Sequence, residues 1–254
     1  MSDSGRIPTN LRTLLIMEAF SEANSALTAA EIGRSIGLAK PTAHRLCQSL
    51  EAEGFLVRQT GSKRFQPARR ARSMAGGLLY AASTHIARHQ VLEELAREVG
   101  ETVNFVVPAE TGMRYLDRVE TDWPFRVQFG VGSDVPFHCT ASGKTFMASL
   151  APRARRTFVS ALNLERHTRH THATTETLLE DLEEIAERGY ALDKEEFIEG
   201  MVAIAVPVFN PEGRFAAALA FHGPKNRVSL ETALARKDLM IEGAHKLGIA
   251  LFSD

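Results

Sequence analysis

Apolar residues recur at helical spacing near the start of the chain and predict two helices there. The first is expected over Asn10–Glu22, where leucines at positions i, i+3 and i+4 begin an apolar stripe. A second, shorter helix should begin at Thr28-Ala-Ala-Glu31. This is a capping box, in which the threonine oxygen accepts an amide of the first turn and the glutamate accepts the cap amide. Gly37 ends this helix, because glycine enters the left-handed region at least cost.

A third helix and a hairpin complete the pattern of a small domain over residues 1–70. Lys40-Pro41 follows a very short turn, and proline is favoured at the first position of a helix. The buried face of this helix is predicted to be Ala43, Leu46, Cys47 and Leu50. Gly54 ends it, and two extended segments, Phe55–Gln59 and Arg64–Gln66, are joined by turn residues. Three helices and a hairpin in this order predict a winged helix-turn-helix.

Charge divides unevenly between this domain and the rest of the chain. Residues 1–75 hold 11 basic and 6 acidic residues, a net of +5, whereas the remainder holds 19 and 25, a net of −6. Such asymmetry is expected if only the first part meets a polyanion. The third helix would place its first residues at base edges in the major groove, and the wing would contact phosphate or the minor groove. The predicted DNA-binding residues are Lys40, Pro41, Thr42, His44, Arg45, Arg58, Lys63 and Arg64. The alternative is a three-helix domain that contacts proteins.

The rest of the chain predicts a linker helix over 71–84 and an α/β domain over 85–254. Gly76-Gly77 suggests some looseness in the linker. Strands and helices joined by hairpin turns imply a mainly antiparallel sheet with helices on its faces. The expected helices are His85–Val99, with Ile86 and Leu92 on the buried side, Thr175–Arg188 and Ser229–Leu251; the expected strands are Thr102–Val107, Met113–Val119, Phe125–Phe129, Val202–Phe209 and Arg214–Phe221.

Composition and motifs argue against an enzyme. Two cysteines, Cys47 and Cys139, and no apolar run of membrane-spanning length suggest a cytoplasmic protein without disulfides. Gly143-Lys144-Thr145 resembles the end of a phosphate-binding loop, but His138 stands where the pattern needs glycine. We expect no cofactor. A polar stretch contains His167, His170 and His172, and the sequence leaves open whether this stretch is a metal site or a solvated loop.

Two further stretches have the character of a ligand pocket. His138–Lys144 is a loop of small residues that opens into a helix, so its amides and the hydroxyls of Thr140 and Ser142 suit an anionic oxygen. The acidic turn Asp193–Gly200 precedes the hairpin, and Asp193 would accept a hydrogen bond from the far end of a ligand. His222 at a strand end would either donate to a carboxylate when protonated or be packed against backbone.

These motifs together resemble the IclR family of bacterial transcription regulators over nearly the whole chain. The resemblance is carried by Lys40-Pro-Thr-Ala-His-Arg-Leu46, His138–Lys144, Gly189-Tyr-Ala-Leu-Asp-Lys-Glu-Glu196 and Pro207…Gly213…Gly223-Pro224. It implies a GAF-like effector-binding domain, assembly into dimers or tetramers, and control by a small organic acid. The dimer would read a pseudo-palindromic operator. Family pocket positions fall on Ala141, Ser142, Asp193, Met201, Ala203, Ala220 and His222.

Two positions depart from the family pattern, because Ala203 stands where cysteine is frequent and His222 where a small hydroxyl residue is frequent. The functional prediction is a DNA-binding transcription regulator whose operator affinity depends on the effector; a repressor is expected, and the sequence leaves an activator open because the family contains both. The alternative is a domain that modifies its ligand, with the winged helix as a protein-interaction module.

Overall fold

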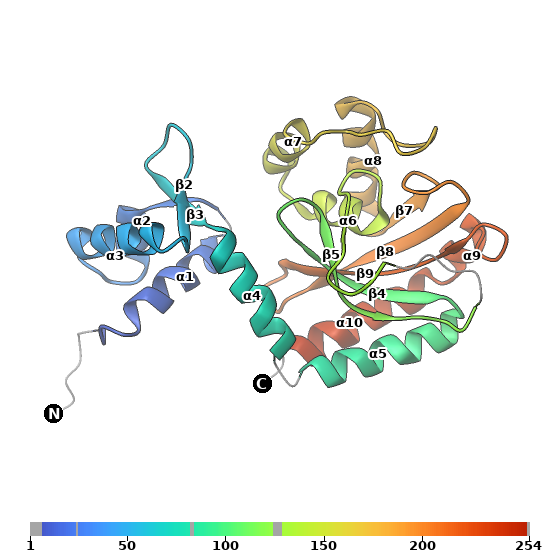
Figure 1. Cartoon of the computed structure of the whole chain (residues 1–254), viewed down its shortest axis with the longest axis horizontal. Coiled ribbons are helices and arrows are strands. Elements are labelled where there is room, and N and C mark those ends of the chain that lie inside the picture. The colour runs from blue at the N-terminus through green and yellow to red at the C-terminus, as the bar shows by residue number, and fades with distance from the viewer. Residues whose placement is uncertain (1–6, 24, 82–83, 124–128, 253–254) are drawn as a thin grey trace. The chain divides into compact units, whose positions relative to one another are not determined.

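The computed structural model describes residues 7–23, 25–81, 84–123 and 129–252. They fall into two compact units, Met1–Ala81 and Ala82–Asp254, each with its own hydrophobic core. Figure 1 labels most of the elements of both units. Among the described residues, no helix is long and apolar enough to cross a membrane.

The first unit is a winged helix-turn-helix. The capping box is confirmed: Thr28 N–H donates to Glu31 Oε2 at 2.7 Å, and Glu31 N–H donates to Thr28 Oγ1 at 3.2 Å. Gly37 has a positive φ of 68°, as expected of a helix stop. The helices are α1 (Arg12–Ala23), α2 (Ala29–Ser35), α3 (Lys40–Ala52) and α4 (Arg69–Ala81). The strands are β1 (Leu27–Thr28), β2 (Leu56–Arg58) and β3 (Arg64–Pro67), in the antiparallel order β1-β3-β2.

The core of this unit joins all three N-terminal helices to the wing. Ile16, Ile32, Cys47 and Phe65 are essentially inaccessible to solvent, and each full burial of a large apolar side chain stabilises by about 1.5–3 kcal/mol. The two-residue strand β1, which the sequence pattern does not predict, pairs with β3 and closes the wing against α2. Helix α4 runs through the two glycines of the linker.

The second unit is an antiparallel six-stranded sheet, in the order β6-β5-β4-β9-β8-β7, between two layers of helices. The fold class expected from the sequence, a mainly antiparallel α/β domain, is confirmed. The strands are β4 (Thr102–Pro108), β5 (Met113–Val119), β6 (Asp134–Val135), β7 (Ala191–Lys194), β8 (Met201–Phe209) and β9 (Phe215–Pro224). The helices are α5 (Thr84–Val99), α6 (Ala141–Ser149), α7 (Pro152–Ser160), α8 (Thr175–Arg188), α9 (Leu230–Ala235) and α10 (Lys237–Phe252).

Alternation along the central strands separates the two faces of this sheet. On β9, Leu219 and Phe221 join the core beneath α5 and α10, whereas Ala218 and Ala220 join the core beneath α6 and α8 (Figure 1). The α6 side is therefore lined by small side chains. Large side chains would fill this space, so the small ones let α6 approach the sheet closely and leave room for a cavity at its N-terminal end.

Two sequence predictions for this unit need correction. The helix expected over Ser229–Leu251 is two helices, because the first ends at Arg236. Ile86, expected on the buried side of its helix, is 62 % exposed. Helix α7 and the strands β6 and β7 were not predicted. The strand expected over Phe125–Phe129 lies outside the described residues except for Phe129, which is not in a strand.

Candidate functional site

The start of α3 presents the side chains that the sequence assigns to DNA. Lys40, Pro41, His44 and Arg45 are exposed, and Thr42 is half-buried. Proline lies in the first turn, as predicted from the Lys40-Pro41 pair. The turn before the helix is tight because Gly33 of α2 packs closely: a Cβ there would lie 2.9 Å from the carbonyl oxygen of Leu38. This close packing holds α2 against α3 and leaves the first turns of α3 at the surface.

The wing has three basic side chains, Arg58, Lys63 and Arg64, and two of them are engaged in contacts within the unit. Lys63 at the hairpin tip is exposed. Arg58 pairs with Glu51 through Nε at 3.0 Å, and its guanidinium lies 4.6 Å from the Phe65 ring centroid. Both of these contacts hold Arg58 against its own domain.

Arg64, which the sequence predicts beside the wing tip as a contact to phosphate, is also engaged within the unit. Its guanidinium donates to both carboxylate oxygens of Glu31, at 2.9 and 3.0 Å, and to the carbonyl of Ala26 at 2.8 Å. Glu31 thus caps α2 and anchors the wing at once. The hydrogen bond from the Thr28 backbone is the main reason that the pKa of Glu31 lies below its usual value.

Eight of the nine predicted effector-binding residues line one small cavity of about 40 Å³ in the second unit. The cavity lies between the N-terminus of α6, strand β7 and the ends of β8 and β9. His138 is the exception: it is buried, and its Nε2 lies 2.8 Å from the carbonyl oxygen of Glu165. The eight are Thr140, Ala141, Ser142, Asp193, Met201, Ala203, Ala220 and His222.

One end of the cavity is the first turn of α6. Thr140 caps this helix: its Oγ1 accepts the Gly143 amide at 3.1 Å and donates to the carbonyl of Pro136 at 2.7 Å. The Gly143 amide is thus already engaged, although the sequence suggested it for an anion. Gly143 is required for another reason, because a Cβ there would lie 2.2 Å from the carbonyl oxygen of Phe137. The amides of Ala141 and Ser142 belong to the same first turn, whose dipole favours negative charge.

The other end of the cavity holds a buried carboxylate. Asp193 is 6 % exposed, and its Oδ1 accepts the amides of Glu196 at 2.7 Å and of Phe197 at 3.4 Å. Burial is the main cause that raises the pKa of Asp193 to about 7; the neighbouring charge of Glu196 adds to the rise, and the amide donors oppose it. Near neutral pH this carboxyl group therefore exists in both protonation states.

Several lining residues escaped the sequence analysis. Asn104 on β4 is buried, and its Nδ2 lies 3.1 Å from His222 Nδ1. Tyr115, Phe129 and Phe197 form an aromatic wall, with ring centroids 6.1 Å apart for the first pair and 5.7 Å for the second. Alternation on β4 and β5 could have placed Asn104 and Tyr115 on the cavity face, but the sequence pattern did not reveal which sheet end carries the cavity.

A buried ion cluster lies behind α6. Lys144 Nζ donates to Asp181 Oδ2 at 2.7 Å and to Glu196 Oε1 at 2.5 Å. Burial alone lowers the pKa of Lys144, but the two carboxylates outweigh it and raise the pKa above its usual value. The Gly-Lys-Thr sequence thus serves an internal ion pair. Because Glu196 also donates its amide to Asp193, the cluster connects α6 to the acidic end of the cavity.

The three histidines of the polar stretch do not converge. His167 lies with His138 and Cys139, whereas His172 faces Asp181 and Glu196. His170 contacts neither group and accepts a hydrogen bond from Arg169. The hypothesis that His167, His170 and His172 bind one metal ion together is therefore wrong.

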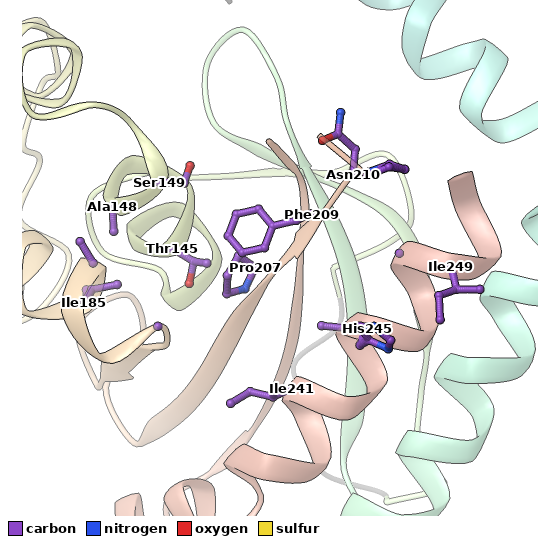
Figure 2. A pocket seen from close by; sticks show the side chains of 15 residues that line it. Thr145, Ala148, Ser149, Ile185, Pro207, Phe209, Asn210, Ile241, His245 and Ile249 are labelled. Atoms are coloured by element: carbon purple, nitrogen blue, oxygen red, sulfur yellow. The ribbon is translucent and has the colours of Figure 1, made fainter. Parts of the chain in front are cut away.

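A larger, open groove of about 760 Å³ lies elsewhere in the second unit (Figure 2). Its walls come from α6, the end of α8, the β8–β9 turn and α10. Ile241 and Ile249 of α10 and Phe209 of β8 are about half exposed along it. The groove contains none of the predicted effector residues, and its lining is mainly apolar.

Comparison with known proteins matches both units. Residues 11–60 match the model of the IclR helix-turn-helix domain, and residues 79–247 match the C-terminal model of bacterial transcriptional regulator IclR. The probable transcriptional regulator SauR of Cupriavidus necator is 37 % identical over 221 residues, covering 87 % of this chain and 88 % of SauR. The transcriptional repressor IclR of Escherichia coli is 27 % identical, covering 97 % of this chain and 91 % of that protein.

A solved structure extends the likeness to a ligand-binding domain. The inducer-binding domain of a PobR double mutant from Acinetobacter, in complex with 3-hydroxybenzoic acid, is 28 % identical with a TM-score of 0.60. It covers 66 % of this chain, which covers 98 % of it. The relatives are transcription regulators rather than enzymes. The two family matches together span most of the sequence, and this chain belongs to the IclR family of bacterial DNA-binding transcriptional regulators.

Proposed function

We propose that the protein is a repressor whose affinity for operator DNA is set by a small organic acid bound in the 40 Å³ cavity. One observation carries the proposal: residues separated by some 80 positions in sequence, from Thr140 to His222, line a single cavity. The bound hydroxybenzoate of the related inducer-binding domain supports an acid as the effector. The name of the Escherichia coli relative supports repression.

The two ends of the cavity suit the two ends of such a ligand. The first turn of α6, with the Ser142 hydroxyl, would receive the carboxylate, because helix N-termini favour negative charge. Asp193 at the far end would exchange a hydrogen bond with a hydroxyl or amine. His222 would contribute a donor when protonated. No lysine or arginine occurs among the described lining residues, so the first turn of α6 would supply the positive potential.

Binding would require the cavity to enlarge. Ligand pockets typically measure roughly 300–1,000 Å³, so the present cavity of about 40 Å³ is too small for an aromatic acid. Phe129 and Phe197 form the wall that would have to move. A ligand that binds the enlarged state preferentially shifts the population toward it, and DNA affinity changes if the two states differ in that affinity.

We further propose that α4 contributes to a dimer. Met74 and Leu78, one turn apart on this helix, are 42 % and 63 % exposed. Burying these side chains against the same helix of a second copy would remove apolar surface from water. Two copies would then read two half-sites of a pseudo-palindromic operator in the cytoplasm. Light scattering at micromolar concentration should show no dominant monomer, and a monomer that binds operator tightly would contradict this.

The effector proposal is tested by gel shift on the promoter beside the protein's own gene, with 3-hydroxybenzoate first and then a panel of small acids. One acid should change the affinity for this DNA and should bind the free protein in calorimetry. Ser142→Val and His222→Ala should each weaken that binding, whereas His170→Ala, outside the cavity, should not. If both cavity variants bind the acid as the parent does, the cavity is not the effector site.

A further inference from the structure

Three metal-ligating side chains converge outside the effector cavity. One nitrogen of His138, the sulfur of Cys139 and one nitrogen of His167 all lie within 4.8 Å of one another. His138 and Cys139 are buried in the turn before α6, and His167 is exposed in the irregular segment between α7 and α8. We propose that these three residues form a zinc-binding site.

The surroundings of His138 and His167 favour this assignment. Nε2 of His138 lies 2.8 Å from the carbonyl oxygen of Glu165, which accepts its N–H and leaves the other ring nitrogen for a metal. Metal-bound histidines commonly donate their second N–H to a carbonyl in this way. The His167 ring meets the Phe197 ring edge-on at 5.4 Å, and its backbone N–H donates to Thr171 Oγ1 at 3.1 Å. Both imidazoles are thus held in place by neighbours.

Zinc binding displaces the thiol proton of Cys139, since thiolate is the form that binds metal. One proton is released to solvent when the ion binds.

The ligand set points to zinc in particular. Two imidazoles and one thiolate are typical zinc ligands, and the exposure of His167 leaves a fourth position for water. The neighbouring group of His172, Asp181 and Glu196 differs, because the ammonium of Lys144 already lies 2.7 and 2.5 Å from its two carboxylates.

Zinc would also tie two parts of the chain together. His138 and Cys139 directly precede Thr140, which caps α6 and lines the effector cavity. His167 belongs to an irregular segment of 14 residues between Ser160 and Thr175. Irregular segments of this length are uncommon and are often functional. Binding would fix this segment to the turn that shapes one end of the cavity.

The test uses the full-length protein, stripped with a chelator and titrated with Zn²⁺ against a chromophoric competitor, and separately with Co²⁺. Wild type should bind one equivalent of Zn²⁺ per chain. Bound Co²⁺ should show tetrahedral visible bands and a thiolate-to-cobalt charge-transfer band in the near ultraviolet. Cys139→Ser should lose the charge-transfer band, whereas Cys47→Ser, a change at the other buried cysteine, should keep it.

His167→Gln gives a second test that does not depend on a buried substitution. It should lower the Zn²⁺ affinity at least about tenfold. His170→Gln and His172→Gln should leave it unchanged. The proposal is overturned if wild type binds well under one equivalent, if the cobalt complex has no thiolate band, or if His167→Gln binds zinc as wild type does.

Discussion

Asp193→Asn should stabilise the effector-binding unit progressively as the pH rises from 5 to 7. Folding raises the pKa of Asp193 from its ordinary value of 3.8 to about 7, mainly through burial. The folded state therefore keeps a proton that the unfolded chain releases, and stability falls as the pH rises through this interval. Asparagine removes the titration, and its amide oxygen can still accept the Glu196 amide that lies 2.7 Å from Oδ1.

The size of the stability difference follows from the interval between the two pKa values of Asp193, about 3.8 in the unfolded chain and about 7 in the folded state. Each pH unit between the two pKa values costs about 1.4 kcal/mol, so wild type should lose at most about 3 kcal/mol between pH 5 and pH 7 relative to Asp193→Asn. Above pH 7 the difference should level off, because Asp193 is then ionised in both states. Below pH 4 the two proteins should differ little through this group.

The chain supplies a specific probe for this measurement. Trp123 is its single tryptophan and lies in the second unit, so its fluorescence in urea reports the unfolding of that unit. Glu212→Gln, an exposed change in the β8–β9 turn, serves as the control and should show the pH profile of wild type. Parallel profiles for wild type and Asp193→Asn would refute the assignment of a raised pKa to Asp193.

Two further predictions concern the wing and the start of α6. Lys63→Ala should lower the salt dependence of DNA binding by about one unit of slope on operator and random DNA alike, measured by anisotropy at several salt concentrations. Arg64→Ala should instead destabilise the first unit by about 1 kcal/mol, because Glu31 loses its partner; equal stability of the two variants in thermal melts would contradict this. Gly143→Ala should cost about 1–3 kcal/mol in urea unfolding, since a Cβ would lie 2.2 Å from the Phe137 carbonyl; unchanged stability would mean that the turn adapts.

Local signals in the sequence predicted the winged helix well. The capping box at Thr28, the stop at Gly37 and the start at Pro41 depend on backbone chemistry within a few residues, and each appears in the structure. Periodicity alone missed the break at Arg236, because the apolar pattern continues across it. Periodicity also assigned Ile86 to the buried face of its helix. An apolar stripe does not show how much of the helix the rest of the domain covers, and Ile86 is exposed.

Long-range contacts explain what the sequence could not predict. The cavity residues on α6, β7 and β9 were named from two local motifs and a resemblance, but Asn104 and Tyr115 enter the cavity only through sheet pairing. Arg64 looked available at a hairpin tip, yet its partner Glu31 lies 33 residues earlier. The convergence of Cys139 with His167 likewise depends on how an irregular segment returns to α6.

The central claim is that the first turns of α3 read the operator. Its most direct test is the dissociation constant for an operator selected from random DNA, measured by anisotropy for wild type, Arg45→Ala and Arg97→Ala. Both substitutions delete an exposed arginine, the first on α3 and the second on α5. Arg45→Ala should weaken binding by about 1–3 kcal/mol, while Arg97→Ala should not change it. A folded Arg45→Ala protein with the operator affinity of wild type would contradict the account.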